Sequence, residues 1–325
     1  MDRSVGAQSR PAERLRIAIS LGDPRGIGPE VTEKALQRVR QIEPSLHVVA
    51  IGSVGHVQFP LADQSIDVGP WSGDAESAGR VAGLSIERAA HLALLGQVDA
   101  LVTAPVDKSA LRAAGYGFPG QTEMLAHLSG RASVAMMMCA EQTKLGGSLR
   151  VVLATTHLPL ARVPTALTTQ LLVEQARLTH AALRDSWGIT QPRLAVCALN
   201  PHASDGGLFG DEEERLMRPG IDQLRREGIR VWGPIPADTV FVRAIADEFD
   251  AVIAPYHDVG MAAFKTASFG RGVNVTLGLP FPRTSPDHGT ALDIAGRGVA
   301  DASSMLEAVE LAIRLALSQP ITSHR

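Results

Sequence analysis

Short apolar runs, each with the length and composition of a buried strand, are spread along the chain. They occupy residues 16–22, 46–52, 99–105, 132–138, 149–155, 194–199 and 250–255. Longer stretches have apolar residues spaced for one face of a helix and separate most of these runs: 76–96, 168–186, 211–227 and 301–318. A further helix is predicted to begin near Pro29, because proline is tolerated in a first helical turn. Uniformly apolar strands that alternate with helices predict an α/β fold with a largely parallel sheet covered on both faces.

The length bounds the number of domains. The chain has 325 residues, roughly twice the usual length of one domain, so two domains or one large α/β domain are expected. No repeat, low-complexity tract or linker marks a boundary. Residues 1–14 are polar and lack the apolar core of a secretory signal, and we predict a disordered tail there. Residues 55–75 are rich in Gly, Pro, Ser and Asp and are predicted to form a surface excursion.

Charge and composition exclude several classes of protein. The chain has 31 basic and 34 acidic residues, a net charge of −3 with neutral histidines. This balance argues against a nucleic-acid-binding protein, which normally carries a basic excess. No apolar stretch approaches the ~20 residues that cross a bilayer, so no membrane helix is expected and the chain is predicted to be cytoplasmic. Cys139 and Cys197 lie in apolar runs, which favours buried, reduced thiols over a disulfide.

Three histidines follow three of the predicted strands. They are His157, His202 and His257. In an open parallel sheet the loops at the carboxyl ends of the strands build the binding crevice, so these imidazoles are expected to share a site. Imidazoles from separate strands suit a divalent metal, and Asp238 or Asp258 would supply an extra carboxylate. A single histidine of this kind is more often structural, and the spacing matches no local zinc motif.

A glycine-rich turn joins the first strand to the first helix. The run GDPRGIG (22–28) would let backbone amides approach an anion closely. It has neither the spacing of a dinucleotide-binding fingerprint nor the Gly-Lys-Ser/Thr of a P-loop. A tight turn that simply requires glycine explains the run equally well.

A polar cluster lies late in the chain. Lys265, Asn274 and Arg283 suit a phosphate or a carboxylate, although a solvated basic loop would look the same. The segment that follows is predicted to open a helix whose N-terminus would hold a nucleotide phosphate or ribose. Its candidate residues are His288, Gly289, Thr290 and Asp293.

Taken together, the motifs resemble a known family. GDPRGIGPE, APVDK, GQTE, ATTHLPL, NPHASDGG, GPIPADT, YHDVG and GRGVNVTLGLPFPRTSPDHGTALDIAGRG occur in order between residues 16 and 317. They resemble the 4-hydroxythreonine-4-phosphate dehydrogenase family of pyridoxal phosphate synthesis. GDPRGIGPE and HGTALDIAG are also similar, more distantly, to isocitrate and isopropylmalate dehydrogenases, whose fold class the family shares.

The resemblance implies a homodimer of two-domain α/β/α subunits with the active site in the cleft between domains. The domains expected are 15–130 with 285–325, and 131–284. It also implies that NAD, or NADP, oxidises a secondary alcohol of a small phosphorylated substrate to a β-keto acid. That acid then loses its carboxylate and leaves 3-amino-2-oxopropyl phosphate. One divalent metal per site, zinc, magnesium, manganese or cobalt, would assist.

The family's functional residues carry over by position. The metal ligands correspond to His157, His202 and His257, one of them from the partner subunit. The substrate contacts correspond to Thr122, Lys265, Asn274 and Arg283. Asp238 lies near the metal in the family pattern, and residues 288–296 match the segment that holds the adenine side of the cofactor in the isocitrate relatives. Lys108, or a water on the metal, would take the hydroxyl proton.

One position departs from the family. Where the family has His-Thr-Glu, this chain has Gln121, Thr122 and Glu123. A glutamine can hydrogen-bond but carries no titrating proton. The substrate is therefore open, and a paralogue that oxidises D-threonate or D-erythronate 4-phosphate is the alternative. A phosphate acetyltransferase of related fold is a further alternative, which metal dependence would separate from a dehydrogenase. A ligand-binding protein that has lost activity is another.

Overall fold

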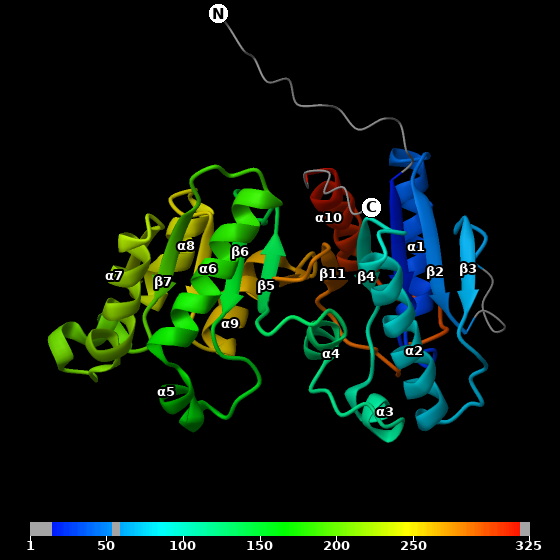
Figure 1. Ribbon diagram of the computed structural model, residues 1–325, viewed down its shortest axis with the longest axis horizontal. Helices are drawn as coiled ribbons and strands as arrows, with labels where there is room; N and C mark the ends of the chain where they lie inside the picture. The colour runs from blue at the N-terminus through cyan, green and yellow to red at the C-terminus, as the bar shows by residue number, and fades with distance from the viewer. Residues whose placement is uncertain (1–14, 54–58, 319–325) are drawn as a thin grey trace, which may run out of the picture.

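The computed structural model describes residues 15–53 and 59–318 (Figure 1). Within them, eleven strands form one sheet in the order β3-β2-β1-β4-β11-β10-β5-β6-β9-β7-β8. The strands are β1 Arg16–Ser20, β2 His47–Gly52, β3 Gln64–Asp67, β4 Ala100–Thr103, β5 Ala135–Ala140, β6 Leu149–Leu153, β7 Arg193–Cys197, β8 Arg230–Ile235, β9 Ala251–Ala254, β10 Val273–Leu277 and β11 Arg283–Pro286. The predicted tail 1–14 lies outside the described residues.

Ten α-helices and three short turns of other helical types complete the described chain. The α-helices are α1 Gly28–Ile42, α2 Ala75–Leu94, α3 Lys108–Ala113, α4 Gln121–Leu128, α5 Val163–Ala166, α6 Thr169–Asp185, α7 Arg218–Arg226, α8 Ala237–Ile245, α9 His257–Ser268 and α10 Ser303–Ser318. The short turns are η1 Leu160–Arg162, η2 Pro201–Gly207 and η3 Glu213–Met217. No helix of this described part is long and apolar enough to cross a bilayer.

The predicted strands and helices are confirmed, with two corrections. The predicted excursion 55–75 contains the edge strand β3. The predicted helix at 288–293 is wrong, because that segment forms only turns and the next helix begins at Ser303. Ala291 has a left-handed φ of 43°, and the carbonyl of Thr290 accepts a hydrogen bond from Ile27 N at 2.9 Å. This segment is therefore fixed as a loop against the glycine-rich turn.

The centre of the sheet differs from its flanks. The flanking strands pair in parallel, as the sequence predicts. In the centre, β10 pairs antiparallel with both β11 and β5, and β5 pairs antiparallel with β6. Figure 1 shows the helices in two groups on either side of β5 and β11. The predicted domain boundary at residue 285 falls inside β11, so the division into two domains stays a prediction while the sheet itself is continuous.

The two faces of the sheet are covered differently. One face carries a single hydrophobic cluster that extends under α1, α10, α6 and α7. The other face carries one large cluster under α2 and α4 and a second under α8 and α9. Alternation along β5 shows the division, because Met137 and Cys139 belong to the continuous cluster and Met138 to the interrupted side. Polar side chains of the central strands occupy the gap between the two clusters.

Both cysteines are buried and reduced, as predicted. Cys139 lies in β5 and Cys197 in β7, and neither forms a disulfide. Burial raises the pKa of both thiols. They are therefore core residues rather than nucleophiles.

Candidate active site

A cavity of about 310 Å³ lies over the uncovered central strands. It collects residues that follow β4, β6 and β9 together with the central strands, so both halves of the sheet contribute to it. The polar and sulfur-containing side chains that line it are Lys108, Gln121, Thr122, Glu123, Met136, Met138, His157, His257, Met261, Asn274, Arg283, Ser285, Asp287 and His288. Gly289 lines it as well. A larger groove of about 690 Å³ lies beside α2, but none of the predicted site residues lines it.

Five of the predicted site residues do not line this cavity. Asp238 and Asp293 are exposed, the first in the opening turn of α8. Lys265 is 54% exposed and pairs with the carboxylate of Asp287, with 3.6 Å between Nζ and Oδ2. The carbonyl of Thr290 accepts a hydrogen bond from the backbone of the glycine-rich turn. His202 is exposed in η2. Within one described chain, the cavity therefore holds only part of the predicted set.

Arg283 is the most unusual of the residues that do line the cavity. It is 1% exposed, and Nη1 and Nη2 donate to Thr276 Oγ1 at 2.9 Å and to Thr103 Oγ1 at 2.6 Å. Within the described ranges no carboxylate lies in salt-bridge distance of it. Desolvation lowers the pKa of Arg283 to about 10, so the guanidinium stays charged at pH 7. A buried charge without a counter-ion is costly, and an anionic ligand in the cavity would offset that cost.

Three buried atoms around the cavity lack a hydrogen-bond partner. They are Asn274 Oδ1, Arg283 Nε and His288 Nε2. Buried polar atoms are almost always paired in folded proteins, and exceptions in one pocket indicate a missing water or ligand. A ligand that carries both an anion and a hydroxyl or amine would supply partners for this acceptor and these two nitrogens.

Gln121 is engaged inside the protein rather than free. Its Nε2 donates to the carbonyl of Ala104 at 3.1 Å, and its Oε1 accepts from Arg283 Nη2 at 3.4 Å. The amide therefore orients the guanidinium from the first turn of α4. Thr122, the next residue, is buried and also lines the cavity.

Two of the three predicted histidine ligands lie together. The rings of His157 and His257 are 5.4 Å apart between centroids. Burial lowers the pKa of His157, and the nearby charges of Lys108 and His257 lower it further. His157 therefore keeps the neutral ring that a metal requires. His257 Nδ1 lies 2.7 Å from Asp258 Oδ1, which leaves Nε2 available. The pair fits a divalent metal.

A third ligand is absent from this pair within one chain. Among the described residues, no three His, Cys, Asp or Glu side chains gather closely enough to hold a metal ion. His202 lies apart from the pair, and its ring packs 6.4 Å from that of Phe209. A site of three histidines therefore requires a second subunit or a rearrangement of this loop.

The loop that carries His202 has an uncommon backbone. Five consecutive residues from His202 to Gly206 have φ between 44° and 71°. Left-handed conformations cost a non-glycine residue roughly 1–2 kcal/mol each, so other contacts must stabilise this loop. The side chain of Glu213, 0% exposed at the start of η3, supplies them. It accepts from Leu199 N at 2.9 Å and from Asn200 N at 2.7 Å.

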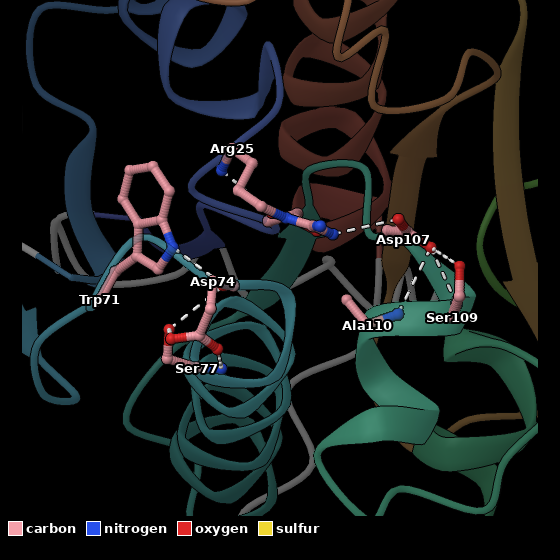
Figure 2. Close-up of polar contacts among 8 residues, drawn as sticks. Arg25, Trp71, Asp74, Ser77, Asp107, Ser109 and Ala110 are labelled. Carbon is pink, nitrogen blue, oxygen red and sulfur yellow. Dashed lines mark hydrogen bonds and ion pairs between the residues drawn. The ribbon is translucent and has the colours of Figure 1, made fainter.

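A charge bridge joins the glycine-rich turn to the start of α3, next to Lys108 of the cavity, and the sequence analysis missed it. Figure 2 shows Arg25 of the glycine-rich turn reaching Asp107, which caps the start of α3. Arg25 Nη2 donates to Asp107 Oδ2 at 3.0 Å and to Asp23 Oδ2 at 2.7 Å. Asp107 in turn accepts from Ser109 N at 2.8 Å. The bridge fixes the helical turn from which Lys108 enters the cavity.

Comparison with known proteins now places this arrangement in a family. The family model described as "Pyridoxal phosphate biosynthetic protein PdxA" matches residues 26–312. The chain belongs to the PdxA family. A 4-hydroxythreonine-4-phosphate dehydrogenase of Paracoccus denitrificans is 43% identical over 326 residues, covering 94% of this chain and 98% of that protein. The predicted family is thereby confirmed.

Solved structures of similar proteins agree with this family and with the predicted fold class. A 4-hydroxythreonine-4-phosphate dehydrogenase of Klebsiella pneumoniae superimposes with a TM-score of 0.82 at 37% identity, covering 94% of this chain and 100% of that one. Isocitrate dehydrogenase of Methylococcus capsulatus superimposes with a TM-score of 0.53 at 16% identity, covering 92% and 85%. The second likeness shows the fold alone.

Proposed function

We propose that this PdxA-family chain oxidises 4-hydroxythreonine 4-phosphate with NAD or NADP. The secondary alcohol becomes a ketone, and the resulting β-keto acid loses carbon dioxide to give 3-amino-2-oxopropyl phosphate. The buried Arg283, charged and with no carboxylate in salt-bridge distance among the described residues, is the observation that carries this proposal, because it favours an anionic substrate over a neutral one. The names of the similar proteins support the same substrate.

Binding follows from the groups that line the cavity. Arg283 presents a fork of donors that suits a phosphate or a carboxylate, and Lys108 lines the same cavity. Asn274 Oδ1 is a free acceptor for a hydroxyl or amine of the substrate, and Thr122 supplies a hydroxyl. Lys265 is held by Asp287 and would orient the loop that contains this aspartate. It would contact the substrate only if its side chain moves when the substrate binds.

Two absent groups would supply the redox and acid chemistry when bound: the nicotinamide accepts a hydride, and a divalent metal, zinc, magnesium, manganese or cobalt, acts as a Lewis acid. His157 and His257 would hold the metal, with His202 of the partner subunit in a homodimer. Lys108 would take the hydroxyl proton as the hydride leaves. His288 and Gly289 would meet the cofactor, with Thr290 and Asp293 in the adjoining loop.

Decarboxylation needs no additional base. When the bond to the carboxylate breaks, its electron pair moves onto the new carbonyl as carbon dioxide leaves. Positive charge beside that oxygen stabilises the enolate that forms. Lys108, protonated in the preceding step, can return its proton to carbon and close the balance of atoms.

The experiment compares substrates directly. NADH formation at 340 nm would be followed with 4-hydroxythreonine 4-phosphate and with D-threonate and D-erythronate 4-phosphates, each with and without chelator. The proposal expects the highest kcat/KM on the amino acid phosphate and loss of turnover with chelator. A higher kcat/KM on either sugar-acid phosphate would show that this compound, and not the amino acid phosphate, is the substrate. Activity that survives complete chelation would remove the metal from the proposal.

A further inference from the structure

Glu213 is a buried carboxylate with no cation in contact with it in the described chain. Among the described residues, the hydrogen bonds of its side chain to other residues all go to the segment 199–204. Besides Leu199 N and Asn200 N, it accepts from Asn200 Nδ2 at 2.9 Å and from the hydroxyl of Ser204. These donors lower the pKa of Glu213 even though burial alone would raise it, so the group is ionised at neutral pH. The negative charge of Glu213 is thus stabilised by hydrogen-bond donors of a neighbouring loop rather than by a cation.

The position of these donors determines what the carboxylate does. Leu199 and Asn200 precede His202 in the chain, and Ser204 follows it. Glu213 therefore clamps the loop on both sides of the imidazole and holds it in its left-handed turn. Because β7 ends at Cys197, the clamp sets the direction in which His202 leaves the sheet.

We propose that Glu213 is the positioning residue of His202. Its carboxylate pre-forms the left-handed turn that presents this imidazole for metal binding in the assembled enzyme. The proposal rests on the role of His202 as a metal ligand in the proposed function. Glu213 does not touch the metal or the substrate, and it acts only through the loop.

The decisive variant is Glu213→Gln. It keeps the size of the side chain but sets an NH₂ group against donors that need an acceptor, so at least one of the four contacts is lost. Three readouts apply to the full-length protein: amide hydrogen exchange of residues 199–206, the Kd for Co²⁺ from its visible absorbance, and kcat/KM. We expect faster exchange in this loop and a Kd for Co²⁺ raised about 10- to 100-fold, as for loss of other partners of metal ligands.

Two controls separate positioning from general damage. Glu214→Gln changes a neighbouring exposed carboxylate that pairs with Arg218, and it should leave all three readouts unchanged. Ser204→Ala removes one arm of the clamp and keeps the rest, so it should give a smaller change of the same kind. It also keeps the proposal testable if Glu213→Gln does not fold.

A double-mutant cycle distinguishes failure of this proposal from failure of the proposed function. If Glu213 acts through the imidazole, Glu213→Gln has no further effect on the Kd for Co²⁺ in a His202→Ala background. An effect of equal size in both backgrounds would overturn the positioning role. An unchanged Kd in Glu213→Gln, where His202→Ala weakens binding, would overturn it as well. If His202→Ala itself leaves Co²⁺ binding intact, the assignment of His202 as a ligand fails, and the positioning proposal falls with it.

Discussion

The two ends of the cavity are built in opposite ways. The end around Arg283 is buried, its guanidinium fixed by hydroxyls of two strands and by Gln121, and it is complete within one chain. The end around His157 and His257 is more exposed, places one histidine in a loop after β6 and the other at the start of α9, and holds two of its three predicted ligands. The difference teaches that the anion site can form on folding, whereas the metal site would form on assembly.

The largest effect is expected at the buried end. Arg283→Met should lower kcat/KM by roughly 10²-fold or more, because a buried charge contact is lost. The same change should raise the free energy of unfolding of the ligand-free protein by roughly 1–3 kcal/mol, since an uncompensated charge becomes apolar. Kinetics and thermal unfolding measured together test both halves. Loss of stability together with unchanged kinetics would show that Arg283 is a structural residue.

Arg283→Lys is the matched control for charge. It keeps one positive charge but loses the planar fork, so KM should rise. The increase in the free energy of unfolding expected for Arg283→Met should not occur. The loss of one charge-assisted contact corresponds to roughly 1.5–3 kcal/mol of binding free energy.

Mixed dimers test the open end. If His157 and His257 serve one site and His202 serves the partner's, inactive His157→Ala and His202→Ala chains should regain up to half of the activity when mixed, because one intact site is rebuilt. Mixtures of His157→Ala with His257→Ala should remain inactive. Measured after co-refolding, the reverse pattern would show that His257 is the ligand that crosses the interface.

Gln121 connects the buried end to substrate choice, and a smaller effect is expected there. Gln121→Leu removes the acceptor of a long hydrogen bond to Arg283, so KM should rise about fivefold, or roughly 1 kcal/mol, with little change in kcat. Gln121→His introduces an imidazole that can titrate near neutral pH, and it should shift the ratio of kcat/KM toward the amino acid phosphate over the sugar-acid phosphates. A ratio that stays constant from pH 6 to 9 would exclude this position as the selector.

The smallest effect is expected at the ion pair between Arg25 of the glycine-rich turn and Asp107 at the start of α3. The hydroxyl of Ser109, two backbone amides of α3 and Arg25 lower the pKa of Asp107 below its usual 3.8. A lowered pKa stabilises the folded state above the unfolded pKa, and the gain is lost as pH falls through the folded value. Asp107→Asn should therefore cost below ~1 kcal/mol at pH 7 and progressively less as the pH falls below 3.8. A cost that does not depend on pH in urea titrations would contradict the ion-pair account.

Strand ends were predictable from the sequence, and the side chains that reach between distant segments were not. The apolar runs before His157 and His257 fix where those histidines leave the sheet, which is why the pair could be anticipated. Burial of Glu213 could not be anticipated, since it is one of four consecutive acids, 211–214, that look like a solvated helix surface. The sequence of β11 is also polar and does not look like a buried strand. The burial of Arg283 follows only from the pairing of β11 with β4 and β10.

The wrong helix at 288–293 has a local physical cause. Asp, Thr and a spaced apolar pattern resemble a helix start, but Gly296 and Gly298 both adopt positive φ. The anchoring of Thr290 to Ile27, 263 residues away in sequence, also holds the backbone out of a helix. No window of neighbouring residues contains that contact.

The interrupted covering of one sheet face has a consequence for how this family can change. In β5 and β10, the side chains that line the cavity alternate with neighbours packed under α6 and α10 on the other face. An exchange at Asn274 therefore alters the cavity floor while the continuous core beneath keeps its side chains. The floor is held by backbone pairing on both sides, so new specificities can be sampled there without first destabilising the scaffold.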